Sequence, residues 1–123
     1  MPDLEASYTQ AYALYQAGRN SRAAHLFRSL CAEAPLEYRF WFGLGSCLQE
    51  SREFQNALQA WAMAALLDPK NPYPHFHAAE CACSLNQMKE AGLALKEAKA
   101  RLVDPNHPLR GPIEVLEEQW RNR

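Results

Sequence analysis

The chain has 123 residues, 48% apolar and 22% charged, a composition typical of one folded domain and unlike a disordered or fibrous chain. Its 13 basic and 14 acidic residues give a net charge of −1, which excludes the basic field that most nucleic-acid-binding proteins use. The longest apolar run, Ala60 to Leu67, is far shorter than the roughly 20 residues of a membrane-spanning helix. Met1 to Glu5 also lack the basic and apolar regions of a secretion signal, so we expect a cytoplasmic protein without stable membrane insertion.

The chain repeats itself with a period of 34 residues. Ala23, Ala57 and Ala91 are one such series, while Pro35 and Pro69 close the first two units. A second series fills the matching large apolar positions with Phe27, Trp61 and Leu95. The pattern predicts helices at about 4–17, 20–33, 37–50, 53–67, 72–85 and 87–102, paired as repeats at about 4–37, 38–71 and 72–105.

Each pair of helices needs a tight turn between its members. Gly18 suits the first turn and Asn86 suits the third, whereas Arg52 at the matching place in the second has no special turn chemistry. The prolines that follow the second helices stop them. We therefore expect three stacked helical hairpins.

A further helix is predicted at about 112–122, after a stretch rich in proline. Ile113, Leu116 and Trp120 recur there at three- and four-residue spacing, with Pro112 at the start. A stack of hairpins leaves an apolar face at its end that must be covered. We interpret this helix as a cap in preference to a binding element.

The middle repeat resembles the tetratricopeptide repeat, a helix–turn–helix unit. The residues that carry this resemblance are Trp41, Leu44, Gly45, Leu48, Phe54, Ala57, Trp61, Ala64 and Pro69. It implies an all-α fold in which three tandem repeats form a short right-handed solenoid, residues 1–123 making one domain with the capping helix. In such a solenoid the first helix of each repeat lines the concave wall.

Aromatic side chains are predicted to line that wall. Tyr8, Tyr12 and Tyr15 fall within roughly a 60° arc of one helix, beside the face that Ala11 and Leu14 occupy. Their equivalents in the other repeats and their neighbours add Arg39, Phe42, Ser46, Gln49, Tyr73, Phe76 and Glu80. A concave apolar surface with a few polar groups suits an extended peptide, with Arg39 and Glu80 fixing its direction. The alternatives are that the stripe is core and that the charges are merely solvated.

A closer resemblance rests on Tyr15-Gln16-Ala17-Gly18, on Phe42-Gly43-Leu44-Gly45-Ser46-Cys47 and above all on Phe76-His77-Ala78-Ala79-Glu80-Cys81. These segments are similar to the class II chaperones of type III secretion, which hold hydrophobic translocator proteins in the cytoplasm of Gram-negative bacteria before export. The resemblance implies groove contacts at Tyr8, Tyr12, Tyr15 and Phe40 or Phe42, and at Phe76, His77 and Glu80. It also implies a homodimer, although the helix that family members generally carry ahead of the first repeat has no counterpart before Leu4.

Other functions fit the sequence less well. A co-chaperone that clamps a carboxylate needs Lys, Arg and Asn where this chain has aromatic residues, and a protein scaffold is the remaining alternative. The histidines and carboxylates form no nucleophile–base set and no phosphate loop, so we expect neither an enzyme nor a cofactor. Four cysteines without a Cys-x-x-Cys pair are expected to be reduced and partly buried. A metal site would have to use His77 and Cys81 with His75 or Cys83, and we expect none.

Overall fold

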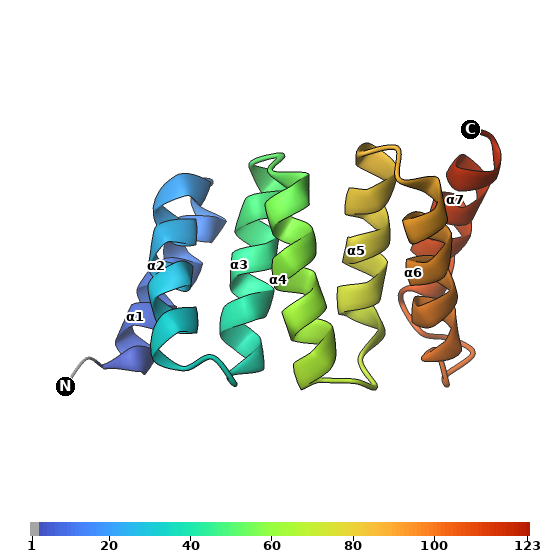
Figure 1. Ribbon diagram of the computed structural model, residues 1–123. Helices are drawn as coiled ribbons and strands as arrows, with labels where there is room; N and C mark the ends of the chain where they lie inside the picture. The colour runs from blue at the N-terminus through green and yellow to red at the C-terminus, as the bar shows by residue number, and fades with distance from the viewer. Residues whose placement is uncertain (1–2) are drawn as a thin grey trace.

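The computed structural model describes residues 3–123, which form seven helices and no strand. Their bounds are α1 (Leu4–Gln16), α2 (Asn20–Glu33), α3 (Tyr38–Glu50), α4 (Phe54–Leu67), α5 (Pro72–Ser84), α6 (Met88–Ala100) and α7 (Arg110–Arg121). The helices stand side by side in chain order, with the two ends of the chain at opposite ends of the row (Figure 1). Each helix packs mainly against its neighbours in the chain, which is the arrangement of a solenoid. The all-α repeat fold predicted from the sequence is confirmed.

Residues 34 positions apart occupy equivalent places in the packing of the helices. Ala23, Ala57 and Ala91 are all buried completely, and their small side chains let adjacent helices approach closely. Phe27, Trp61 and Leu95 are buried at the equivalent large positions. Gly45 permits one such close contact, because a Cβ atom there would lie 2.8 Å from Cε2 of Trp61.

All three hairpin turns have the same backbone geometry. Gly18, Arg52 and Asn86 adopt left-handed conformations, with φ of 78°, 61° and 57°. The residue after each one donates its N–H to a carbonyl one helical turn back, as from Glu53 to Leu48 at 2.8 Å. Arg52 therefore occupies a position that favours glycine or asparagine, a demand that its residue type did not indicate.

Helix α7 covers the end of the stack, as predicted. Ile113 and Leu116 are buried in a cluster with residues of α5 and α6, and Trp120 donates its indole N–H to the carbonyl of Met88 at 2.8 Å. The helix begins at Arg110, two residues earlier than predicted, so Pro112 lies within its first turn. Proline is tolerated there because its missing N–H would have no partner inside the helix.

The buried residues form two clusters. One extends over α1 to α4 and includes Cys81 of α5, and the other joins α5, α6 and α7. All four cysteines are buried free thiols. Burial raises the pKa of Cys31, Cys47 and Cys81 to about 12, so these thiols are protonated and unreactive at neutral pH. None of the helices in residues 3–123 has the length and apolar character required to cross a membrane.

Candidate functional site

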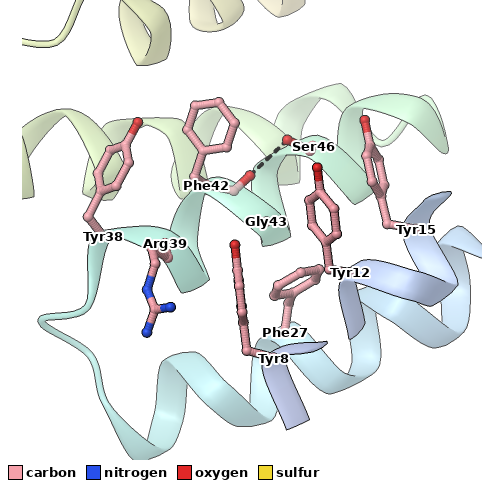
Figure 2. A pocket seen from close by; sticks show the side chains of 9 residues that line it. All are labelled: Tyr8, Tyr12, Tyr15, Phe27, Tyr38, Arg39, Phe42, Gly43 and Ser46. Atoms are coloured by element: carbon pink, nitrogen blue, oxygen red, sulfur yellow. Dashed lines mark hydrogen bonds between the residues drawn. The ribbon is translucent and has the colours of Figure 1, made fainter. Parts of the chain in front are cut away.

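A cleft of about 380 Å³ opens between α1 and α3 on one side of the solenoid. Six of its nine lining residues are aromatic, and the lining comprises Tyr8, Tyr12, Tyr15, Phe27, Tyr38, Arg39, Phe42, Gly43 and Ser46 (Figure 2). The cleft is formed by the first two repeats, and the third repeat contributes no lining residue. Its size is in the range of sites that hold a few side chains of a ligand.

The tyrosine stripe of α1 forms one wall of this cleft. The ring centroids of Tyr8 and Tyr12 are 6.2 Å apart, and those of Tyr12 and Tyr15 are 6.4 Å apart. Tyr12 is 46% exposed, which makes it one of the most exposed large aromatic side chains of the described chain. The hydroxyl groups of all three tyrosines point to the side on which the ring of Phe42 stands (Figure 2). The stripe therefore presents a partly wet aromatic surface and does not seal the core.

Phe27 and Gly43 form the floor of the cleft. Phe27 is a core residue, only 1% exposed, and its ring meets that of Tyr8 edge to face at 6.1 Å. Gly43 of α3 lies over this ring, so that any larger residue would collide with Phe27. Ser46 lines the cleft as predicted, but its hydroxyl donates to the carbonyl of Phe42 at 2.9 Å. The floor thus offers a ligand mainly an apolar surface.

Three lining residues were not predicted from the sequence, namely Phe27, Tyr38 and Gly43. Tyr38 precedes Phe42 by four residues, the same spacing that relates Tyr8 to Tyr12, and that spacing is the signal that could have identified it. The Tyr38 hydroxyl accepts a hydrogen bond from the Asn71 side chain at 2.9 Å. Burial, and secondarily the charge of Asp68, raises the pKa of Tyr38 to about 12, so its hydroxyl is neutral at physiological pH.

Arg39 lies at the edge of the cleft, and its charge is neutralised by two carboxylates. Its guanidinium donates to Glu5 at 2.6 Å and to Glu37 at 2.8 Å, while its plane covers the ring of Tyr8 at 4.7 Å. The hydrogen bond from Arg39 and the charge of Arg39 hold the pKa of Glu5 below its usual range. Arg39 therefore braces the start of α1 against α3.

Two phenylalanines that were predicted to line the groove are core residues instead. Phe40 is 1% exposed and packs beneath Tyr8, with their ring centroids 5.7 Å apart. It lies about 200° around α3 from Phe42, so only Phe42 can face the cleft. Phe76 is 7% exposed because it belongs to the cluster that includes Ile113 and Leu116 of the capping helix.

Three further predicted residues form a polar network between the second and third repeats, outside the cleft lining. Gln49 accepts from the indole N–H of Trp61 at 2.9 Å and donates to Glu80 at 3.0 Å. His77 Nδ1 lies 2.7 Å from the same Glu80 oxygen, and its ring stacks on Trp61 at 4.7 Å. Since these groups are paired with one another, their role is to stabilise the interface between the second and third repeats, beside Phe42.

Tyr73 also lies apart from the cleft, because its ring packs near those of His77 and His107, at centroid distances of 6.3 and 5.7 Å. Of the twelve predicted site residues, the structure brings six together at one cleft. These are Tyr8, Tyr12, Tyr15, Arg39, Phe42 and Ser46.

Within residues 3–123, no three His, Cys, Asp or Glu side chains are grouped so that they could hold a metal ion.

Residues 8–74 match the family model of the tetratricopeptide repeat. The chain is 34% identical over 101 residues to the low calcium response locus protein H of Yersinia pestis, a match that covers 82% of this chain and 60% of that protein. The chain thus spans about 60% of the length of the curated relatives that it matches.

Solved structures with the same fold are similar over nearly the whole chain. The Yersinia enterocolitica type III secretion chaperone SycD, in complex with a peptide of the translocator YopD, is 30% identical with a TM-score of 0.89, and the match covers 97% of this chain and 92% of SycD. PcrH of Pseudomonas aeruginosa, in complex with the chaperone-binding region of PopD, is 32% identical with a TM-score of 0.91, and the match covers 98% and 92% of the two chains. This chain is therefore a tetratricopeptide-repeat protein, and it belongs to the class II translocator chaperones of type III secretion.

Proposed function

We propose that this chain is a cytoplasmic chaperone that binds an extended segment of a type III secretion translocator in the cleft between α1 and α3. The observation that carries the proposal is the open aromatic cleft itself, in which Tyr12 is 46% exposed while the other aromatic side chains of residues 3–123 are half-buried or buried. SycD and PcrH, which share its fold and about a third of its sequence, were crystallised with translocator segments. Binding would keep the apolar client from aggregating or associating prematurely before export.

The chemistry of the cleft suits this task. Tyrosine rings offer a large apolar area with few rotatable bonds, so that ordering them on binding costs little entropy. The wall formed by Tyr8, Tyr12 and Tyr15 can cover the apolar side chains of an extended segment, while the hydroxyl groups bind its backbone. Covering those side chains lowers the concentration of free client, and aggregation falls with it.

Calorimetric titration of the chain with the YopD peptide and with the PopD chaperone-binding region tests this proposal. Tyr12→Ala is expected to weaken binding about 10-fold or more, as for an aromatic residue central to an interface, whereas Tyr12→Phe retains most of the affinity. Val115→Ala is the matched control, since Val115 is an exposed apolar residue on α7 and far from the cleft lining. Circular dichroism verifies that the variants are helical. Failure of both peptides to bind, or equal affinity of Tyr12→Ala and the unaltered chain, would contradict the proposal.

We also propose that the chain acts by binding alone and turns over no substrate.

The pairing of Arg39 argues against a co-chaperone that clamps a terminal carboxylate. Arg39, the charged residue of the cleft, is paired with Glu5 and Glu37, so that the cleft lacks the free cations that such a clamp requires. This observation favours a translocator chaperone over the co-chaperone alternative.

A homodimer remains a prediction, and light scattering of the purified chain over a range of concentrations would test it.

A further inference from the structure

The cleft is apolar within and acidic at the edge where α1 and α3 begin. Arg39 is its only charged lining residue, and two carboxylates, Glu5 and Glu37, lie within 3 Å of its guanidinium. The two negative charges of Glu5 and Glu37 thus exceed the single positive charge of Arg39 at the end of the cleft where α1 and α3 begin. The Glu5 side chain is 69% exposed, so it remains accessible beside a bound segment.

Two further carboxylates act on the tyrosines of the lining. Asp68 contributes to the raised pKa of Tyr38, at the end near Arg39, and Glu50 contributes to the raised pKa of Tyr15, at the opposite end. In both cases burial is the larger cause and the neighbouring negative charge is the second. Asp68 also lies close to the Tyr38 hydroxyl, since the Asn71 side chain donates to Asp68 at 3.1 Å and to the Tyr38 hydroxyl at 2.9 Å.

The start of each helix adds a partial positive charge of about half a unit, which opposes these carboxylates. The beginnings of α1, α3 and α5, together with Arg39, therefore supply about 2.5 positive charges at this end. Asp3, which caps α1, joins Glu5, Glu37 and Asp68 there, so four carboxylates outweigh those charges. At the other end Glu50 closes α3, and Arg52 and the beginning of α4 at Phe54 follow it directly. The negative balance therefore lies at the end of the cleft where α1 and α3 begin.

We propose that the segment held in the cleft carries a basic residue beside its apolar anchors, and that an acidic residue at the same place is disfavoured. The inference rests on the proposed function and specifies the chemistry of the client. Apolar side chains fill the cleft, while a lysine or arginine of the client lies against the carboxylates at the edge where α1 and α3 begin. Complementary charge of this kind chiefly selects among partners and speeds their association.

The test uses the PopD chaperone-binding region with two Lys, two Gln or two Glu residues appended at each end, titrated into the full chain. At low salt the Lys form is expected to bind more tightly than the Gln form, and the Gln form more tightly than the Glu form, by about 3-fold for each step. Raising the salt concentration is expected to bring the three affinities together. In Glu5→Gln and Glu37→Gln the ratio between the Lys and Glu forms shrinks, whereas Glu118→Gln, an exposed carboxylate of α7, leaves it unchanged.

The outcomes separate this inference from the function on which it rests. If all three peptides bind with one affinity at low salt, or if Glu5→Gln and Glu37→Gln leave the ratio intact, the charge preference is overturned while the binding function stands. If none of the peptides binds, or if Tyr12→Ala binds them all as the unaltered chain does, the cleft is not the client site and both proposals fail.

Discussion

Gly43→Ala tests the close packing between the floor of the cleft and the core. A Cβ atom at this position would overlap Cε1 and Cζ of Phe27 and would lie 2.7 Å from Cδ1. Because the Phe27 ring is 1% exposed and packs edge to face on Tyr8, it cannot swing away into solvent. Overpacking of this kind costs about 1–3 kcal/mol, and the better helix propensity of alanine returns up to about 1 kcal/mol. We expect a net loss of about 1–2 kcal/mol in the free energy of unfolding.

Urea denaturation followed by circular dichroism measures this change, and thermal denaturation should show a fall in Tm of about 3–10 °C. Gly111→Ala is the matched control, because nothing lies within 4 Å of a Cβ atom on Gly111 in the first turn of α7. It should raise stability by about 0.5 kcal/mol. In a Phe27→Leu background the cost of Gly43→Ala should fall by about 1 kcal/mol. A Gly43→Ala variant as stable as the unaltered chain, or strict additivity with Phe27→Leu, would refute the close contact.

Three other substitutions or conditions test the fold. Arg52→Gly should raise the free energy of unfolding by about 1 kcal/mol, because it relieves a left-handed backbone at a hairpin turn, and an unchanged Tm would contradict this. Trp120→Ala should cost about 2–3 kcal/mol by loosening the cap, as measured by urea denaturation, and a negligible loss would exclude α7 from the cooperative core. The thiols of Cys31, Cys47 and Cys81 have raised pKa values in the folded chain, so unfolding releases protons above pH about 9. Stability should therefore fall as pH rises from about 9 towards 12, by up to about 1.4 kcal/mol per pH unit for each thiol, and equal urea midpoints at pH about 8 and about 10.5 would contradict it.

The fold could be predicted from the sequence because its packing repeats. The positions of Ala57 and Trp61 are filled by buried apolar residues in every hairpin, and a stack of equivalent contacts leaves a period that the sequence displays. The left-handed turn at Arg52 was the exception. The hairpin imposes the left-handed backbone at Arg52, although arginine does not favour that conformation.

The site was only partly predictable, because equivalent positions have different neighbours along the stack. Tyr8, Phe42 and Phe76 are related by 34 residues, yet the first two line the cleft while Phe76 is covered in the cluster of the capping helix. The period alone does not say which copies meet the cap. Likewise, the pairing of Gln49 with Glu80 joins residues 31 apart, outside the period, so no repeat position indicates it.

The tyrosines allow the most direct test of client binding in the cleft. Four of the five, Tyr8, Tyr12, Tyr15 and Tyr38, line the cleft, and Tyr73 lies outside its lining. Fluorotyrosine incorporation gives each ring its own fluorine resonance, which can be followed while the YopD peptide is added. We predict that the four cleft resonances shift with one shared binding curve while that of Tyr73 stays in place. A peptide that binds but shifts Tyr73 and leaves the four others unmoved would contradict the cleft as the client site.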